Sequence, residues 1–566
     1  LINGILRGEW AFDGLVVSDW GGSRGRVQAL KAGADLEMPE CRISAAEVVA
    51  AVQCGELEES VLNKSVQRIC QFAERADKIE AVPFDVDEHD KFAQKVAEES
   101  LVLLKNQDCA LPLNNSERIA VIGDFAKTPR YQGAGSSQII PTSLSNILGV
   151  IGQSGLNFVG FARGFERFGG ENKKLLKAAL KLVERCDTAI VCIGLDEDKE
   201  CEGLDRSNLR IDDNQVELLE ALAKTGKKIV AVLSCGSAVE TDWDCNVNAL
   251  LLAHLSGQSG ARAVINALTG KINPSGKLAE SYPVKLADVP CFEIYSESPY
   301  KSDYAEGIYV GYRYYNTFDI PVKYPFGYGL SYTQFAYSDF KVDDGGVCVT
   351  VTNSGERDGA EVVQVYVKAP RPDMPASPSE LKLFTKIFLR AGESKQVHLP
   401  YDEYTFRTWN SKTHRFEAGG VYEISVNADS LRKLFTARYE VTPDNLPEGC
   451  AFAEMREQSE ITFKEYFESR LTPDEPHEVS EKLVANLDMQ VADLIYCKGL
   501  VAKLFGTIAK MYKKSEDKLM ATAFDWLRVR SLLQFMNLTS VQAEGFILAC
   551  NGHFFKGMRK LLSKKY

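Results

Sequence analysis

The spacing of apolar residues separates two long regions of the chain with different predicted folds. Between residues 87 and 285, short apolar runs alternate with helical patterns, which is typical of a parallel sheet covered by helices on both faces. Between residues 336 and 441, apolar and polar positions alternate, with a turn signal at Asn353-Ser354-Gly355, and this predicts a small β-sandwich. The apolar runs of the first region are residues 101–104, 119–123, 189–194, 229–233 and 249–253.

Two other regions have weaker patterns. Residues 286–335 are rich in tyrosine and glycine, which favours a packed connection between domains over a wall on which sugars stack. Residues 445–566 have helical patterns, and Thr539 with Gln542 predicts a capping box for a helix that ends at Asn551-Gly552. The basic amphipathic segment 554–562 is expected to pack on its own domain, with an anionic membrane or a partner as the alternative.

Residues 1–80 contain two units in which a short apolar strand precedes a helix, whereas a closed barrel of such units needs eight. In the first unit, Leu15-Val16-Val17 predicts a strand buried on both faces, and Ser18, Asp19 and Trp20 follow it. The carboxyl end of such a strand is where α/β enzymes keep their chemistry. The alternative is that Asp19 caps the next helix.

The helices predicted in residues 1–80 carry signals of their own. Ser44 and Glu47 have the spacing of a capping box, ahead of an apolar helix face that ends at Gly55. A second helix is expected from about residue 58 to 72. Its buried side chains should be Val61, Leu62, Val66 and Ile69.

A cluster of carboxylates follows the predicted strand at 189–194. Six acidic residues lie between positions 196 and 205, and Glu200 and Glu202 are two of them. Crowding or burial at the carboxyl edge of a parallel sheet raises the pKa of at least one carboxyl group, as a general acid requires. The alternative is a solvated acidic surface loop.

Composition narrows the class of protein. A length of 566 residues predicts three or four domains, and a formal net charge of -12 argues against a nucleic-acid binder. Fourteen scattered cysteines and six separated histidines support neither a disulfide framework nor a zinc site, so a reducing, cytoplasmic location is expected. No apolar run approaches the ~18 residues of a membrane span. The chain begins with Leu1, so a secretion signal upstream remains compatible with it.

Several separate motifs together resemble glycoside hydrolase family 3, in its β-glucosidase-like branch. The first is the run FDGLVVSDW, which ends with Asp19 and Trp20. A run at residues 359–367 resembles the fibronectin-III-like domain of the family, and the likeness extends in order over residues 1–441. The other motifs are residues 32–39, 98–106, 131–137, 273–278 and 324–332.

The resemblance and the residue pattern together predict a multidomain α/β plus β protein with four parts and a connection. The resemblance implies the C-terminal part of a TIM-like barrel (residues 1–80), an α/β sandwich (87–285) and a fibronectin-III-like domain (336–441), and the pattern adds an aromatic-rich connection (286–335) and a helical C-terminal region (445–566). The family pattern has no counterpart of the last region. Family members hold the sugar with residues from earlier barrel loops, which this chain lacks, so the chain by itself is expected to be inactive.

The resemblance also assigns roles. Asp19 would be the nucleophile, Trp20 an apolar wall on the leaving-group side, and Glu202 the general acid/base, with Glu200 in reserve. A retaining mechanism needs two carboxyl groups ~5–5.5 Å apart, and the charge of Asp19 would raise the pKa of Glu202. The implied activity is release of terminal β-D-glucosyl residues from small or oligosaccharide β-glucosides, without metal or cofactor. A β-xylosidase, an α-arabinosidase and a non-catalytic carbohydrate-binding protein are the alternatives, and a homo-oligomer is left open.

Overall fold

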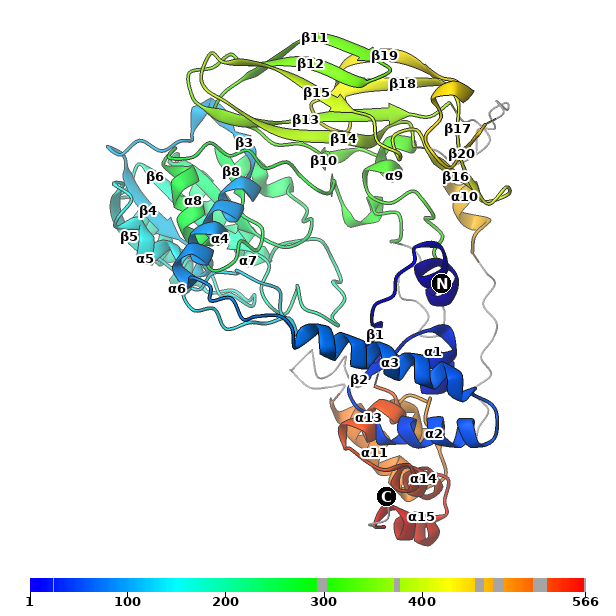
Figure 1. Ribbon diagram of the computed structural model, residues 1–566. Coiled ribbons are helices and arrows are strands. Elements are labelled where there is room, and N and C mark those ends of the chain that lie inside the picture. Colours follow the sequence, from blue (N-terminus) through cyan, green and yellow to red (C-terminus); the bar gives the residue numbers. More distant parts are fainter. Residues whose placement is uncertain are drawn as a thin grey trace. The chain divides into compact units, whose positions relative to one another are not determined.

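The computed structural model describes residues 1–23, 25–292, 303–370, 377–453, 463–471, 483–512 and 527–563 (Figure 1). The chain forms two compact units. Residues 85–474 make up the larger unit, and residues 1–84 together with 475–566 make up the smaller one. Short 3₁₀ helices lie at Gln107–Cys109, Asp124–Ala126, Asp242–Asn246, Leu286–Asp288, Pro443–Asn445 and Ala492–Tyr496, and a π-helix at Ile2–Glu9.

The α/β region of the larger unit is built on a sheet whose described strands have the order β3-β8-β7-β6-β4-β5. These strands are β3 (Val102–Asn106), β4 (Arg118–Ile122), β5 (Asn157–Ala162), β6 (Thr188–Gly194), β7 (Lys228–Ser234) and β8 (Ala249–Leu252). The pairs from β8 to β5 are parallel, as predicted. β3 is antiparallel to β8, so that part of the prediction was wrong. Since β3 is as apolar and buried as its neighbours, its pattern does not report its direction.

Helices surround this sheet in two groups. α4 (Val86–Ser100) and α5 (Ile147–Ile151) both contact α8 (Gly260–Leu268), and α6 (Lys173–Val183) contacts α7 (Asp213–Ala223). The helical patterns predicted near 174–183 and 215–223 are therefore confirmed. Local caps start two helices: the Asp85 side chain accepts two backbone N–H groups at the start of α4, and Asn172 does so at α6.

The β-sandwich is confirmed as two antiparallel sheets. One contains β11 (Phe335–Asp343), β12 (Gly346–Asn353) and β15 (Ser394–Pro400). The other contains β14 (Glu380–Leu389), β13 (Gly359–Lys368), β18 (Gly420–Asn427) and β19 (Lys433–Val441). Alternate valines of β12 and β13, such as Val349 and Val365, are fully buried between the sheets.

Smaller elements complete the larger unit. They are β9 (Tyr282–Pro283), α9 (Tyr312–Thr317), β10 (Val322–Tyr324), β16 (Thr408–Asn410), β17 (Arg415–Ala418), β20 (Cys450–Phe452) and α10 (Phe463–Glu468). Tyr309, Tyr314 and Tyr315 are buried in one aromatic cluster, as expected for a packed connection. β20 pairs with β17, so the chain just beyond residue 445 continues the β structure.

In the smaller unit, β1 (Val17–Trp20) and β2 (Leu36–Met38) form a parallel pair connected by α1 (Arg26–Ala32), and α2 (Arg42–Gln53) and α3 (Glu59–Ala76) follow β2. The described residues contain no closed barrel. The predicted burial of β1 on both faces was wrong, because Val17 is 47% exposed. In the described part of the chain, β2 is the sole strand that pairs with β1.

Two details of the predicted helices were also wrong. α2 begins at Arg42, so Ser44 lies inside the helix, where its hydroxyl donates to Glu37 Oε1 (3.3 Å) instead of capping. Val66 on α3 is 48% exposed. Val61 and Leu62, one turn earlier in α3, are partly buried against α1 and α2.

The C-terminal helices share a core with the N-terminal segment. These helices are α11 (Leu500–Tyr512), α13 (Val529–Phe535), α14 (Ser540–Cys550) and α15 (Phe554–Leu561). Cys41 and Ile43, at the start of α2, belong to the same buried apolar cluster as Leu494, Leu533 and Phe546. The helical region after residue 475 is therefore packed on the first βα units rather than forming a body of its own.

Two local predictions for these helices are confirmed. Thr539 and Gln542 form the capping box at the start of α14. α15 packs on α14, where a Cβ added to Gly557 would lie 2.6 Å from the carbonyl oxygen of Gly545. The close approach of the two backbones requires glycine and agrees with packing of the basic segment on its own domain. No helix in the described parts of the chain is both long and apolar enough to span a bilayer.

Arg530→Ala is expected to destabilise the smaller unit by about 2 kcal/mol. The Arg530 side chain is 13% exposed and donates to both carboxylate oxygens of Glu47, at 3.0 and 3.1 Å. Hydrogen exchange of α2 would measure the loss. Lys560→Ala is the control, because its partner Glu544 is 56% exposed and the pair should contribute under about 0.5 kcal/mol. Equal effects of the two changes would contradict the role given to Arg530.

Candidate active site

Asp19 lies where β1 ends, beside the end of β2. The two strands are parallel, with Trp20 opposite Met38, so both carboxyl ends reach the same edge. The Asp19 side chain is exposed, and its Oδ1 accepts the backbone N–H of Trp20 at 2.6 Å. It does not cap a helix, since α1 begins at Arg26 after Gly25. The carboxylate is therefore accessible to a substrate at the strand end.

The ends of β1 and β2 are tied together by hydrogen bonds. The Met38 N–H donates to Ser18 Oγ at 2.9 Å, and the Gly21 N–H donates to the Met38 carbonyl at 3.0 Å. These bonds fix the backbone on both sides of Asp19. The Trp20 side chain is 65% exposed, which leaves its apolar face open.

A buried carboxylate that sequence reasoning missed anchors the same strands. Asp35 is 1% exposed and pairs with Arg7 at 2.6 Å and with Arg68 at 3.0 Å. It also accepts the Val16 N–H at 2.9 Å. Its place in the motif at 32–39 was the available signal, but the arginines lie 28 and 33 residues away in sequence.

The acidic loop after β6 is neutralised by cations rather than crowded. Arg167 donates to both oxygens of Glu197, at 2.6 and 2.9 Å, and this holds the pKa of Glu197 below its usual range despite burial. Lys199 pairs with Asp212 and with the buried Asp196. The expectation that crowding raises a carboxyl pKa in this loop was wrong for Glu197, because Arg167 enters from outside the loop.

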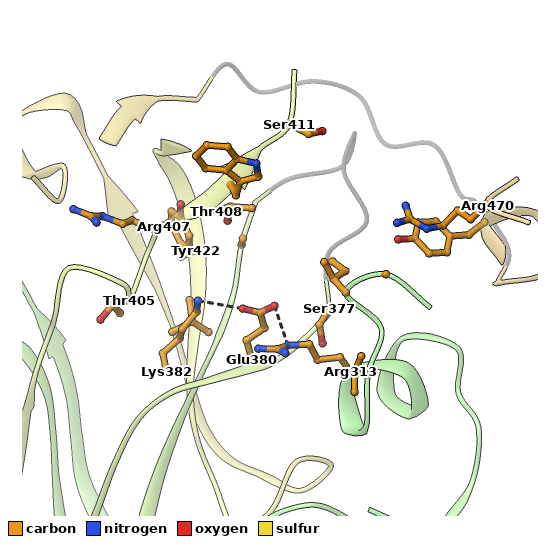
Figure 2. Close-up of a pocket in the computed structure, with 17 residues that line it drawn as sticks. Arg313, Ser377, Glu380, Lys382, Thr405, Arg407, Thr408, Ser411, Tyr422 and Arg470 are labelled. Carbon is orange, nitrogen blue, oxygen red and sulfur yellow. Dashed lines mark ion pairs between the residues drawn. The ribbon is translucent and has the colours of Figure 1, made fainter. Parts of the chain in front are cut away.

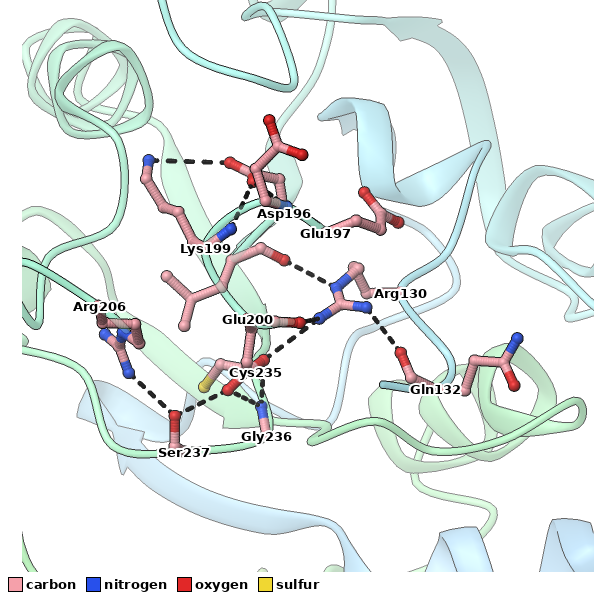
Figure 3. A network of polar contacts seen from close by, with 12 residues as sticks. Arg130, Gln132, Asp196, Glu197, Lys199, Glu200, Arg206, Cys235, Gly236 and Ser237 are labelled. Carbon is pink, nitrogen blue, oxygen red and sulfur yellow. Dashed lines mark hydrogen bonds and ion pairs between the residues drawn. The ribbon is translucent and has the colours of Figure 1, made fainter. Parts of the chain in front are cut away.

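Three neighbouring residues donate hydrogen bonds to the Glu200 carboxylate (Figure 3). Its carboxylate accepts the Gly236 N–H at 2.8 Å, the Ser237 hydroxyl at 2.7 Å and Arg130 Nη2 at 3.4 Å. Arg130 is itself buried and donates to the carbonyl of Leu195 at 3.0 Å. Glu200 therefore connects the loop after β6 with the loop after β7. Few positions on its carboxylate oxygens remain free to accept another hydrogen bond.

Glu202 is exposed and contacts a different segment. Its carboxylate accepts the Ser136 N–H at 2.8 Å and also the Ser136 hydroxyl. The Glu202 N–H donates to the carbonyl of Ala134 at 3.0 Å. Gly135 has φ +107° and a Cβ there would meet the Glu202 Cβ at 2.6 Å, so the turn requires glycine. The motif at 131–137 thus forms the support of Glu202.

The Ser136 hydroxyl and backbone N–H lower the pKa of Glu202. This is opposite to the raised pKa expected of a general acid, since hydrogen bonds to a carboxylate favour its ionised form. Asp19, whose charge was expected to raise that pKa, belongs to the other compact unit. The contacts inside the larger unit alone therefore keep Glu202 ionised.

Ser136→Ala is expected to raise the pKa of Glu202 toward its ordinary value. The change removes the hydroxyl that contributes most to the lowering and keeps the backbone N–H. In residues 1–566, NMR titration of carboxyl-labelled glutamate would follow this shift. Ser137→Ala, one position along, should leave the titration unchanged. A lower or unaltered pKa in Ser136→Ala would show that the hydroxyl does not favour the carboxylate.

Sequence reasoning also missed Glu280 and Arg206, two half-buried charged residues that interact electrostatically with Glu200. Burial raises the pKa of Glu280, and Arg206 donates to Ser237 Oγ at 2.9 Å and to the Ala238 carbonyl at 3.0 Å. Arg206 follows the acidic loop directly, and that position was the one signal available. In the described residues, no group of three or more histidine, cysteine, aspartate or glutamate side chains is arranged to hold a metal ion.

Comparison with known protein families matches three parts of the chain. Residues 1–72 match the glycosyl hydrolase family 3 N terminal domain, residues 101–332 the glycosyl hydrolase family 3 C-terminal domain, and residues 361–430 a fibronectin type III-like domain. The structure of β-glucosidase 3B from Thermotoga neapolitana with glycerol has a TM-score of 0.70 and 32% identity, over 78% of this chain and 68% of that one. The chain belongs to glycosyl hydrolase family 3.

Other family 3 proteins are similar over comparable spans. Thermostable beta-glucosidase B of Acetivibrio thermocellus is 42% identical over 427 residues, which are 73% of this chain and 56% of that protein. Exo-alpha-(1->6)-L-arabinopyranosidase of Bifidobacterium longum is 39% identical over 76% of this chain and 59% of that protein. A β-glucosidase structure from Bifidobacterium adolescentis has a TM-score of 0.74 at 39% identity. The chain thus spans a little over half the length of these two curated relatives.

The family 3 matches divide the candidate residues between two domains. Asp19 and Trp20 lie in the N terminal domain match, and Glu200 and Glu202 lie in the C-terminal domain match. Helices α11 to α15 lie outside all three matches. The comparisons leave those helices without a family role.

Proposed function

We propose that the whole protein is a retaining exo-β-glycosidase that releases terminal β-D-glucosyl residues. The observation that carries this proposal is Asp19, an exposed carboxylate at the carboxyl end of a parallel strand in a family 3 domain. Relatives named β-glucosidases support the glucosyl substrate.

In the proposed reaction, Asp19 attacks the anomeric carbon while Glu202 gives its proton to the glycosidic oxygen. The bond between that carbon and oxygen breaks, and a glycosyl ester on Asp19 forms. Glu202 then takes a proton from water, whose oxygen attacks the anomeric carbon. The ester bond breaks, Asp19 regains its charge, and the sugar leaves with retained configuration.

Glu202 must carry a proton in the first step, yet Ser136 favours its ionised form. The proposal therefore requires a negative charge near Glu202, as Asp19 would supply, or loss of the Ser136 bond when substrate binds. Trp20, which is 65% exposed, would give the leaving group an apolar wall. Glu200 is the weaker candidate for the acid/base, since Gly236, Ser237 and Arg130 occupy its oxygens.

Hydrolysis by the whole protein of matched 4-nitrophenyl glycosides tests the proposal. We expect the highest kcat/KM with the β-D-glucoside, and NMR should show β-glucose as the first product. Faster turnover of the β-D-xyloside would favour a β-xylosidase. Faster turnover of an α-L-arabinoside would favour an arabinosidase, which the Bifidobacterium longum relative makes the second candidate. Glycan binding without turnover would indicate a non-catalytic protein.

Residues 1–566 by themselves are expected to hydrolyse none of these glycosides detectably. In the described residues, β1 pairs with β2 alone and Val17 is 47% exposed, so the strand that carries Asp19 has a partner strand on one edge only. Limited proteolysis should cut before about residue 90 while the larger unit persists, because that unit has its own core. Activity close to that of the whole protein would contradict this expectation.

A further inference from the structure

A cavity of about 520 Å³ lies beside the β-sandwich (Figure 2), and no residue of the α/β sheet lines it. Its walls come from the ends of β13 and β14, the hairpin of β16 and β17, the loop before α9, and α10. Cavities of roughly 300–1,000 Å³ suit small ligands. All of its lining residues belong to the larger unit, and neither Asp19 nor Glu202 is among them.

The cavity holds more positive than negative charge. Glu380 lies between two cations, with Lys382 Nζ at 3.1 Å and Arg313 Nε at 3.3 Å. Figure 2 shows both ion pairs meeting at the one carboxylate. Arg470 lies on the opposite wall, with its guanidinium 5.2 Å from the Tyr466 ring. Arg407 also lines the cavity, so one carboxylate accompanies four cations, and the excess positive charge favours an anion.

An exposed aromatic face completes the cavity. Trp409 lines the cavity, and its side chain is 48% exposed. Phe416 contacts the indole at a ring separation of 5.2 Å and 72°, which fixes its orientation. A held indole with one open face offers an apolar platform next to polar groups, the combination that a sugar ring fits.

We propose that this cavity binds an acidic saccharide, a sugar unit that bears a carboxylate such as a uronic acid. The ring lies against Trp409, and the carboxylate faces the cations around Glu380 and Arg470. Charge-assisted bonds to arginine and lysine supply the preference for an acidic over a neutral sugar. The proposal concerns binding alone and does not depend on catalysis at Asp19.

Titration calorimetry on residues 1–566 tests this with methyl β-D-glucuronide and methyl β-D-glucoside, which differ in one carboxylate. We expect the glucuronide to bind at least ten times more tightly and to weaken as salt is added. Inorganic phosphate is the third probe, and it should bind more weakly than the glucuronide because it lacks the ring.

Substitutions of lining residues test whether the glucuronide binds in this cavity. Trp409→Ala should abolish glucuronide binding and Arg470→Gln should weaken it about tenfold. The matched controls are Phe388→Ala and Lys433→Gln, whose residues lie outside the cavity. Phe388 is an aromatic residue of the same sandwich that is 60% exposed, and Lys433 is a cation of β19. Both variants should bind the glucuronide as tightly as the unaltered protein does. If Trp409→Ala misfolds by circular dichroism, Arg470→Gln decides.

Three outcomes overturn the proposal. Equal affinity for glucoside and glucuronide removes the carboxylate from recognition. Phosphate binding as tightly as the glucuronide reduces the cavity to a simple anion site. Binding of no probe, or glucuronide binding that Trp409→Ala and Arg470→Gln leave intact, removes the site altogether.

Discussion

Asp19→Asn is expected to lower kcat/KM of the whole protein by at least about 10³-fold, because the amide oxygen cannot form the glycosyl ester. The change keeps the size of the side chain. It also keeps an oxygen that can accept the backbone N–H of Trp20, as Asp19 Oδ1 does at 2.6 Å. The fold should therefore be unaffected. Asp13→Asn is the matched control, since its carboxylate is 81% exposed and makes one long pair with Arg75 at 3.4 Å.

Labelling supplies the independent measurement. A 2-deoxy-2-fluoro glycoside should trap the ester in the unaltered protein, and peptide mapping should place the label on Asp19. A label on Asp13 or on a residue outside the end of β1 would contradict the assignment. Loss of activity in Asp19→Asn together with loss of the folded signal would show a structural effect instead.

Glu202→Ala is expected to reduce cellobiose hydrolysis by about 10²–10⁴-fold while sparing part of the rate with a dinitrophenyl glycoside. An activated leaving group departs without a proton, whereas the glucose of cellobiose does not. Added azide should restore turnover and give the β-glycosyl azide. Kinetics of both substrates in the whole protein would measure the difference.

Glu200→Ala is the comparison that decides between the two carboxylates. Its removal leaves the Gly236 N–H and the buried Arg130 without that partner, so we expect lower stability and similar losses with both substrates. If Glu200→Ala instead shows selective loss with cellobiose and rescue by azide, Glu200 is the acid/base and Glu202 is not.

Much of the fold could be predicted from local pattern because burial repeats with the period of each element. The runs at 189–194 and 229–233 became the central strands β6 and β7, and the alternation at 347–352 became β12. The direction of a strand and the exposure of its side chains were harder to predict from the same pattern. β3 has the apolar pattern of a parallel strand yet runs antiparallel, and Val17 is exposed although it ends the apolar run Leu15-Val16-Val17.

The positions of the candidate site residues could be predicted from the sequence better than their pKa values. Asp19 does lie at a strand end, and Glu202 does project from the acidic loop. The lowered pKa values of Glu197 and Glu202 come from Arg167 and Ser136, which lie 30 and 66 residues away in sequence. Spacing within the loop carries no information on such partners, so the expected crowding was misleading.

The core shared by α2 and the C-terminal helices has a consequence for synthesis on the ribosome. Ile43 is buried with Phe546, which is translated about 500 residues later. At ~5–20 residues per second, the first βα units wait roughly 25 to 100 s for this partner. The larger unit can fold during that interval, whereas the segment with Asp19 stays exposed to chaperones and proteases until the helices around Phe546 have been translated.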